Sequence, residues 1–399
     1  MDRKLTQPRK KPSIIIWGGW YGSRNIGDRL LLISIAELIR KYLGEFRLVV
    51  ITARPSLVEE YFKPNPGITW TTLQPLREPF RIISEIARCH LFIFGGGVPF
   101  FDQTKQLFIM GVYHSLLRLF RKKYYLWCVS CFKLRNRLAE KVFARVINHS
   151  TAVTCRDQFT VDEFNRIGLV QSIAIVPDPV FSISDFDEIE ALRLAEKYGL
   201  NRKDRYFALS PRTLRFNDTE ADTHYNTRTR DDVEKQIRVY SQALDWLVDQ
   251  GVIPVFIPMN TQAPDDDRIA ARQIISRSKH SERAILVDEI IQPLAAAPLY
   301  RHCEGSLVSR VHGSVNSFLG LCPVIMYAFE TKHLGIMQSM DLEDLVYSPQ
   351  GDPDDQIERL LVRLYKNKSS IQSAMAARKK ENEISLLGMS SEVCSMIKD

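Results

Sequence analysis

Short apolar runs alternate with longer amphipathic stretches along the chain from residue 14 onward. The stretch Asp28–Leu43, for example, places its leucines and isoleucines on one face at helical spacing. This alternation is typical of a parallel sheet covered by helices. The strands that we predict in this first series are Ile14–Trp17, Leu48–Ile51, Leu91–Phe94, Tyr125–Val129, Ala152–Thr154 and Ile173–Val176.

The alternation breaks after Phe181, where an acidic helical stretch, Asp185–Tyr198, ends in Gly199. A second series of predicted strands follows, at Phe207–Leu209, Val252–Ile257, Ala284–Val287, Ser306–Val308 and Val324–Met326. The pattern predicts an α/β fold in which two Rossmann-like domains face each other across a cleft, the arrangement called GT-B. We place the domains at residues 1–183 and 205–350, with a linker at 184–204 and a charged helical segment at 351–399 that could pack across the junction.

The composition is that of a globular protein, with 45% hydrophobic and 25% charged residues. Lysine and arginine total 54 against 47 aspartate and glutamate, a net charge of +7 that suits anionic partners. The basic residues follow no zinc-finger, basic-zipper or RNA-binding signature, so we expect no nucleic-acid partner. Small anions or acidic lipid headgroups fit the charge better.

The cellular compartment is suggested by cysteine usage and by the absence of long apolar runs in this sequence. Seven irregularly spaced cysteines cannot all pair, which favours free thiols and a reducing compartment. No stretch reaches the roughly 20 apolar residues of a membrane span. We therefore expect a cytoplasmic protein, with peripheral contact at the inner face of the membrane through the basic runs Arg118–Lys123 and Lys133–Lys141. The simpler interpretation of both runs is a solvated helix face.

Two glycine-rich segments follow predicted strands. Residues 18–28 read GGWYGSRNIGD and open the first long helix, where backbone amides and the positive helix end can hold an anion. Asp28 is there more simply explained as a helix N-cap than as a catalyst. Gly95, Gly96 and Gly97 predict a tight turn that lets a ligand approach the backbone. Because open α/β sheets bind ligands at the carboxyl ends of their strands, both segments would border one crevice.

The sequence SRVHGS at residues 309–314 lies between a predicted strand and a helix. The arginine fork of Arg310 and the imidazole of His312 would form a pocket for a carboxylate or phosphate beside a titratable group, and Lys332 follows downstream. Arg156 and Arg212 also come directly after predicted strands. An arginine at such a place binds either an anion or a structural carboxylate, and the sequence leaves both open.

The motifs GGWYGSRNIGD, FGGGVPFFD, TCRDQFT, VPDP and SRVHG, followed by ETKH, resemble the polysaccharide pyruvyl transferase family in order and spacing, from Ile14 to about Ser348. The resemblance implies transfer of the pyruvyl group of phosphoenolpyruvate to a sugar as a ketal, with the second domain on the donor side and the first on the acceptor side. It implies donor contacts from Arg156, Arg212, Arg310, His312 and Lys332. Further candidate substrate contacts are Trp20, Tyr21, Asn25, Asp28, Gly95, Gly96 and Gly97.

The family chemistry assigns a role to His312, which we expect to act as the general acid or base. We expect no cofactor and no metal, because no metal-ligand spacing is evident and the basic side chains could neutralise the donor. The acceptor would be a hexose of a polysaccharide or a lipid-linked glycan. Two alternatives remain: a nucleotide-sugar glycosyltransferase of the same architecture and a non-catalytic scaffold at a membrane surface. Glu330 is followed eight positions later by Gln338, where retaining glycosyltransferases of this fold often carry a second glutamate, which counts against the first alternative.

Overall fold

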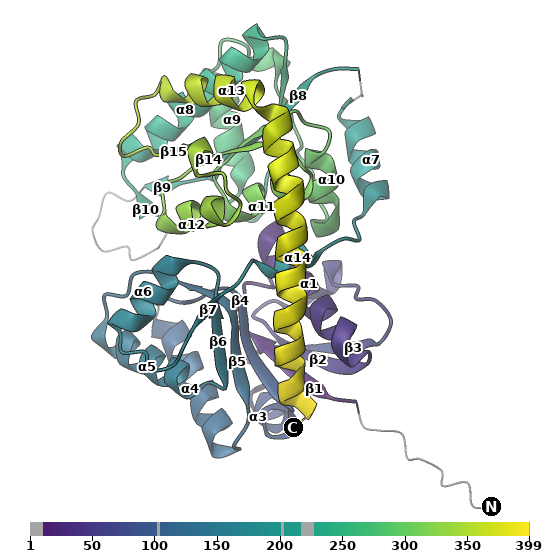
Figure 1. The fold of residues 1–399 in the computed structure, drawn as a ribbon, viewed down its shortest axis with the longest axis vertical. Helices are drawn as coiled ribbons and strands as arrows, with labels where there is room; N and C mark the ends of the chain where they lie inside the picture. The colour runs from purple at the N-terminus through teal and green to yellow at the C-terminus, as the bar shows by residue number, and fades with distance from the viewer. Residues whose placement is uncertain (1–10, 102–103, 201–202, 217–226, 399) are drawn as a thin grey trace, which may run out of the picture.

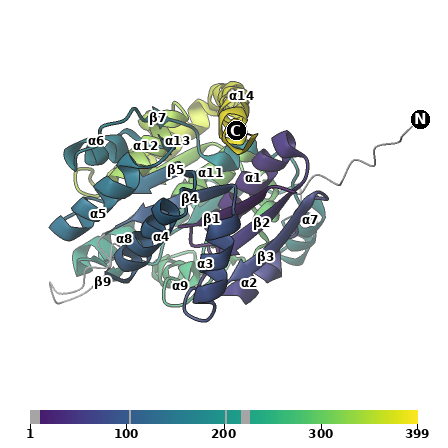
Figure 2. The same ribbon diagram turned by 90° about the horizontal axis from the view of Figure 1, so that it is seen from below.

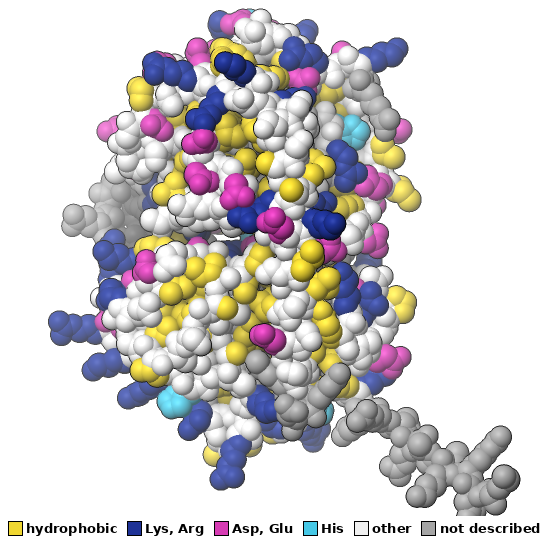
Figure 3. Space-filling view, viewed as in Figure 1, with side chains coloured by type: hydrophobic (Ala, Val, Ile, Leu, Met, Phe, Trp, Pro, Cys, Tyr) yellow, Lys and Arg dark blue, Asp and Glu magenta, His cyan; other side chains and the backbone are white. Residues whose placement is uncertain are grey.

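Two α/β domains stack end to end in the computed structural model, which describes residues 11–101, 104–200, 203–216 and 227–398. The first domain is the lower one in Figure 1, and a single long helix runs down both domains. In the space-filling view the two domains meet along a seam (Figure 3). The predicted α/β class and the two-domain Rossmann-like arrangement are therefore confirmed.

The first domain is built on a seven-stranded parallel sheet with the strand order β3-β2-β1-β4-β5-β6-β7. The central strands are apolar on both faces, as expected for a parallel sheet buried between helices. Helices α1 and α2 pack on one face, and α3, α4 and α5 lie side by side on the other (Figure 2). The strands are β1 (Ser13–Trp17), β2 (Phe46–Ile51), β3 (Ile68–Leu73), β4 (Leu91–Phe100), β5 (Tyr124–Cys131), β6 (Ala152–Cys155) and β7 (Ala174–Ile175). The helices are α1 (Ile26–Leu43), α2 (Pro55–Tyr61), α3 (Pro79–Arg88), α4 (Thr104–Leu119), α5 (Arg137–Asn148), α6 (Gln158–Arg166) and the 3₁₀ turn η1 (Pro179–Ser182).

The second domain has a six-stranded parallel sheet with the order β12-β11-β8-β13-β14-β15. Its strands are β8 (Tyr206–Ser210), β11 (Ile253–Phe256), β12 (Ile285–Leu286), β13 (Ser306–Val308), β14 (Val324–Tyr327) and β15 (Val346–Tyr347), and β9 (Arg215–Phe216) pairs with β10 (Thr227–Arg228) outside it. The helices are α8 (Arg230–Asp249), α9 (Asp267–Arg277), α10 (Ala296–Tyr300), α11 (Val311–Leu319), α12 (Thr331–Ser339) and α13 (Gln356–Lys366), with 3₁₀ turns η2 (Ser281–Arg283), η3 (Pro293–Ala295) and η4 (Glu343–Leu345).

Two helices tie the domains together. Helix α7 (Glu188–Lys197), in the segment predicted as the linker, packs against α10 and η3 of the second domain. Helix α14 (Lys368–Lys398) crosses the junction and packs against α1 and η1 of the first domain. The structure divides the predicted C-terminal helical stretch into α13 and α14 at Asn367. Helix α14 buries Met375, Leu386 and Val393 along its length.

The glycine-rich segment after Leu91–Phe94 is not the turn that we predicted. Strand β4 continues through it to Phe100 and pairs with β5, with an irregularity in register between Gly97 and Phe100. Gly96 and Gly97 have φ angles of +61° and +119°, which side chains rarely adopt, so glycine keeps the strand continuous through the bulge.

Candidate active site

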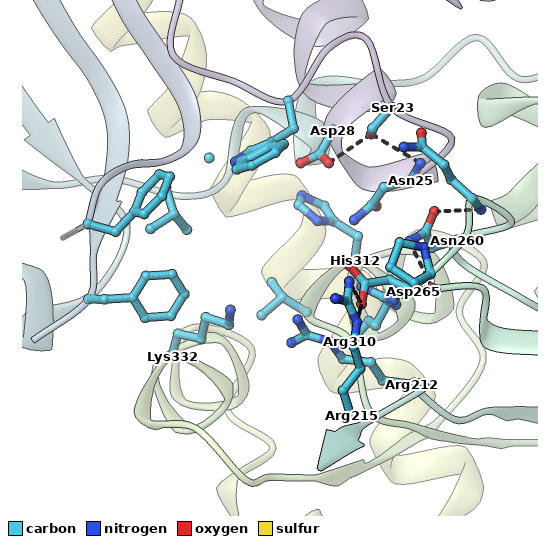
Figure 4. Close-up of a pocket in the computed structure, with 18 of the residues that line it drawn as sticks. Ser23, Asn25, Asp28, Arg212, Arg215, Asn260, Asp265, Arg310, His312 and Lys332 are labelled. Carbon is cyan, nitrogen blue, oxygen red and sulfur yellow. Dashed lines mark hydrogen bonds and ion pairs between the residues drawn. The ribbon is translucent and has the colours of Figure 1, made fainter. Parts of the chain in front are cut away.

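A cavity of about 460 Å³ lies between the domains, where the loops that follow the parallel strands of both sheets meet. Figure 4 shows that side chains from both domains converge on it. Six basic side chains and two carboxylates line it. The basic residues are Arg54, Arg156, Arg212, Arg215, Arg310 and Lys332, and the acidic ones are Asp28 and Asp265.

The loop before α1 forms one wall of the cavity. Asn25, not Asp28 as we predicted, caps the helix, because its side-chain oxygen accepts a hydrogen bond from the Gly27 amide at 2.9 Å. Asp28 lies in the first helical turn, accepts a 3.1 Å hydrogen bond from the Ser23 hydroxyl and lines the cavity. Burial raises the pKa of Asp28, although the nearby His312 opposes the shift. Capping therefore falls to Asn25, and the Asp28 carboxylate points toward the site (Figure 4).

The same loop also contacts the second domain directly. The Ile26 amide donates to the Met259 carbonyl at 2.9 Å, and the Arg24 amide donates to the Gln262 side chain at 3.1 Å. Gly27 packs against His312 so closely that a Cβ atom there would lie 2.1 Å from the imidazole. A side chain at position 27 would therefore displace the histidine or separate the domains.

Arg310 lies at the start of α11, directly after β13 and Ser309, but its guanidinium has a carboxylate partner inside the protein. Its Nε and Nη2 atoms each donate to one oxygen of Asp267 at 2.7 Å, and both side chains are largely buried. Asp267 also accepts hydrogen bonds from the Thr213 and Asn260 amides. This bidentate pair fixes the arginine at the cavity wall. The structure thus gives Arg310 a positioning partner that the sequence did not reveal.

His312 lies two residues further, in the first turn of α11, and faces the Asp178 carboxylate. Its Nε2 atom is 3.5 Å from Oδ2 of Asp178, which is longer than a good hydrogen bond but close for an electrostatic contact. The same Asp178 oxygen accepts from Arg156 at 3.0 Å, and Arg156 also donates to the Ser130 hydroxyl at 2.6 Å. Burial alone would raise the pKa of Asp178, but His312 and Arg156 outweigh it and hold that pKa at about 2. Asp178 is therefore ionised at neutral pH.

Glu330 gathers three basic side chains on the opposite side of the site. Its carboxylate is 2.6 Å from Nζ of Lys332, 3.2 Å from Arg228 and 3.4 Å from Arg212. Burial opposes its ionisation, yet Lys332 and Arg212 keep the pKa of Glu330 well below its usual value. Burial lowers the pKa of Lys332, and Glu330 opposes that shift. The Lys332 ammonium also lies 4.9 Å from the centre of the Phe132 ring of the first domain, so it reaches across the cleft.

The structure brings most of the predicted site residues to the cavity but leaves some behind it. Trp20, Asn25, Asp28, Gly97, Arg156, Arg212, Arg310, His312 and Lys332 line the cavity wall. Tyr21 does not: it is fully buried, and its hydroxyl donates to the Gly95 carbonyl. Gly95 and Gly96 are also absent from the wall, because β4 carries them behind the loop. Tyr21 therefore supports the loop from inside.

Sequence reasoning missed Asp178, Asp267 and His333. Asp178 belongs to the VPDP motif after a predicted strand, and His333 ends the ETKH motif. These motifs could have identified both residues as part of the site. His333 is fully buried at the cavity, and neither ring nitrogen has a hydrogen-bond partner among the residues that the structure describes. Burial lowers the pKa of His333 to about 3, so the ring is neutral at physiological pH. No sequence motif identifies Asp267, because it lies 43 residues before Arg310, with which it pairs.

Two searches among the described residues bear on metal binding and on the membrane. Histidine, cysteine, aspartate and glutamate side chains nowhere gather there in groups of three that could hold a metal ion. In the same part of the chain, none of the helices is both long and apolar enough to cross a membrane.

Solved structures share this architecture at low sequence identity. A structure of HepE from Anabaena, determined with UDP and glucose, superposes with a TM-score of 0.60 at 10% identity, covering 98% of this chain and 100% of that one. Sucrose-phosphate synthase from Thermosynechococcus elongatus gives a TM-score of 0.59 at 11% identity, with coverage of 98% and 100%. A putative UDP-N-acetylglucosamine 2-epimerase from Listeria monocytogenes gives 0.58 at 11% identity, with 94% of each chain covered. These likenesses establish the GT-B fold.

The sequence itself was compared with protein families and with curated proteins. The comparison with curated proteins found no match. The family described as polysaccharide pyruvyl transferase matches residues 25–330, a range that includes the cap of α1, the Arg310–His312 segment and Glu330. Because this match covers well over half of the chain, the protein belongs to the polysaccharide pyruvyl transferase family and is a transferase.

Proposed function

We propose that the enzyme transfers the pyruvyl group of phosphoenolpyruvate to a sugar and releases phosphate. The observation that carries the proposal is the arrangement of Arg156, Arg212, Arg310 and Lys332 around His312 in one cavity between the domains. Phosphoenolpyruvate places a carboxylate and a phosphate on one small frame, so it needs several cations held apart from one another. The family assignment supports the same chemistry.

The donor fits best against the cations that Glu330 gathers. Arg212 and Lys332 line the cavity, and both contact the Glu330 carboxylate. An anionic donor could form charge-assisted hydrogen bonds with both side chains. Arg156, although paired with Asp178, faces the same cavity from the first domain. Donor binding would thus draw on cations from both domains.

His312 is the proposed proton donor. In the reaction, the methylene carbon gains a proton from His312, a sugar hydroxyl adds to the adjacent carbon and loses its proton, and the bond to phosphate breaks. A second hydroxyl then closes the ketal. One hydroxyl proton restores the histidine, and the other leaves with phosphate or solvent. Asp178, 3.5 Å from Nε2, acts as a positioning residue that orients the ring.

An aromatic wall of the first domain suits the acceptor. Trp20 lines the cavity, is 45% exposed and stacks on Phe101 with 6.1 Å between the ring centres. Phe132 lines the same side. A sugar ring can lie on such a surface while its hydroxyls face His312, which supports binding of a hexose of a polymeric or lipid-linked glycan to the first domain.

Replacement of Trp20 tests this placement. We expect Trp20→Ala to raise the acceptor KM about tenfold, since loss of one aromatic contact of about 1.4 kcal/mol corresponds to that factor. The KM for phosphoenolpyruvate should stay within about twofold, and Trp20→Phe should retain most acceptor affinity. Steady-state kinetics with each substrate varied in turn measure both constants. An equal rise of both would show that the loop, rather than the sugar contact, has been damaged.

The function itself is tested with the purified protein and its possible donors. We expect phosphoenolpyruvate at about one hundred times its dissociation constant to stabilise the fold by about 2.7 kcal/mol, measured as a thermal shift. Phosphate should be released from it only when a glycan acceptor is present. If a nucleotide sugar stabilised the protein instead and donated its glycosyl group, with no pyruvate in the product, the proposal would be overturned in favour of a glycosyltransferase.

A further inference from the structure

One segment of the first domain has a net positive charge larger than that of the whole chain. Residues 104–149, which form α4, β5 and α5 with their connections, contain ten lysines and arginines and a single glutamate, a net charge of +9. The whole chain has a net charge of +7, so the remainder is net negative. The one glutamate, Glu140, is paired with Arg166 at 2.8 Å. Basic side chains project from the left and lower margins of this domain, over α5 and α4 (Figures 1 and 3).

Helix α4 presents an apolar stripe to solvent on the same surface. Phe108, Val112 and Leu119 recur at helical spacing, and Phe108 and Leu119 are 70% and 71% exposed. The opposite side of α4 buries Leu107, Met110 and Leu117 against the sheet, so the helix is apolar on two faces. The domain core therefore does not explain the outer stripe, which is suited to an apolar environment outside the protein.

Helix α5, which packs against α4, carries exposed basic side chains. Arg137, Lys141 and Arg145 are exposed at successive helical turns, and Leu138, 62% exposed, lies beside them. Within the described part of the chain these three side chains form no ion pair, so their charges are available to a partner. Helices α4 and α5 pack against each other. Together, Phe108, Val112, Leu119, Leu138 and the three α5 cations form what we call the α4–α5 face.

We propose that the α4–α5 face docks the enzyme on an anionic lipid bilayer, with the apolar stripe entering the headgroup layer and the α5 cations binding acidic headgroups. An amphipathic surface of this kind gains from both contributions at once. A soluble polyanion would satisfy the cations but leave Phe108 and Leu119 in water. A second copy of the chain would bring two strongly positive faces together, which like-charge repulsion disfavours.

The α4–α5 face is connected in the chain to the cavity wall, so docking on a membrane would affect access of the acceptor to the site. Phe101 and Phe132, which line the cavity, lie just before α4 and α5 in the chain. The segments that begin this face therefore also form the first-domain wall of the site. An enzyme docked in this way would hold that wall near the membrane, where a lipid-linked acceptor would be found. The docking itself does not depend on the proposed donor chemistry.

Flotation of the full-length protein with lipid vesicles tests the proposal. We expect binding to vesicles of phosphatidylcholine with phosphatidylglycerol, weakened by salt, and little binding to phosphatidylcholine alone. The triple variant R137E/K141E/R145E should bind at least about a hundredfold more weakly, because each basic residue near an anionic surface contributes roughly a factor of five. The triple variant F108S/V112S/L119S should lose about tenfold while leaving the pyruvyl transfer rate to a soluble acceptor unchanged.

Matched controls use exposed residues elsewhere. I189S/V362S/I384S removes three exposed apolar side chains, and R283E/K366E/K380E reverses three exposed charges, all of them outside the α4–α5 face. Both controls should bind vesicles like the wild type.

Failure of the wild type to float, or full binding by either α4–α5 variant, would overturn the proposal. If the apolar variant bound normally and the charge variant lost binding to vesicles and to heparin alike, the face would be a polyanion site instead. A wild-type dimer that the apolar variant converts to a monomer, without vesicle binding, would make it a self-interface.

Discussion

The variant His312→Gln should lower kcat by roughly 10²- to 10⁴-fold, the usual contribution of a placed general acid or base. Glutamine can still hydrogen-bond at this position but cannot titrate, so proton delivery to the methylene carbon should fail while the donor still binds. The affinity for phosphoenolpyruvate, measured by calorimetry, should change little.

A binding role for His312 would give a different result. The glutamine variant would then bind phosphoenolpyruvate poorly and recover near-normal kcat at saturating donor, and proton transfer would have to be assigned to another group. His333→Gln provides a control in the same cavity, because that imidazole is buried and neutral and lies one turn into another helix. We expect its effect to be mainly on stability. A loss of kcat there equal to that of His312→Gln would remove the distinction between the two histidines.

The second large effect concerns stability. Arg310→Met should lower the free energy of unfolding by about 3–5 kcal/mol, because it leaves the buried Asp267 carboxylate without its bidentate partner. From the sequence we would expect a conservative Arg310→Lys change to act mainly on the donor KM. The structure adds that lysine would also lose one of the two 2.7 Å contacts to Asp267, so stability should fall too. Denaturant titration measures both changes.

A surface pair supplies the comparison for Arg310. Arg277 and Glu234 lie 3.0 Å apart, and each is about half exposed, so Arg277→Met should cost no more than about 1 kcal/mol. The double variant Arg310→Met/Asp267→Asn should recover part of the loss, since it removes the uncompensated charge. If Arg310→Met and Arg277→Met lowered the free energy of unfolding by similar amounts, the buried pair would contribute no more to stability than the surface pair.

The alternation of apolar runs predicted most of the fold because central parallel strands are buried on both faces. Ile14–Trp17 and Ser306–Val308 are continuous apolar segments, and the structure has strands at both. Strand β3 escaped prediction because it lies at the sheet edge, where Ile68–Leu73 alternates threonine with apolar residues and is only partly buried. Strand β15, also an edge strand, is two residues long and leaves almost no pattern.

The site was predictable where chemistry follows a strand and unpredictable where it depends on distant contacts. Arg156, Arg212 and His312 each come shortly after a strand, and the topology of parallel sheets brings such positions together. Their partners could not be predicted in this way. Asp178, which contacts Arg156 and His312, lies in the first domain, whereas His312 lies in the second. Glu330 lies 118 residues from Arg212. The contact between His312 and Asp178 forms only where the two domains dock, whereas the arginines pair with carboxylates of their own domain.

Helix α14 has a consequence for the order in which the protein is made. Its residues Leu386 and Val393 complete the apolar core around α1, and the Tyr42 hydroxyl donates to the Leu387 carbonyl, 345 residues further along the chain. Domains generally fold in order from the amino end during synthesis. The first domain, however, exposes an apolar face until those late residues leave the ribosome. Until α14 has been synthesised, that face is a surface for a chaperone to cover.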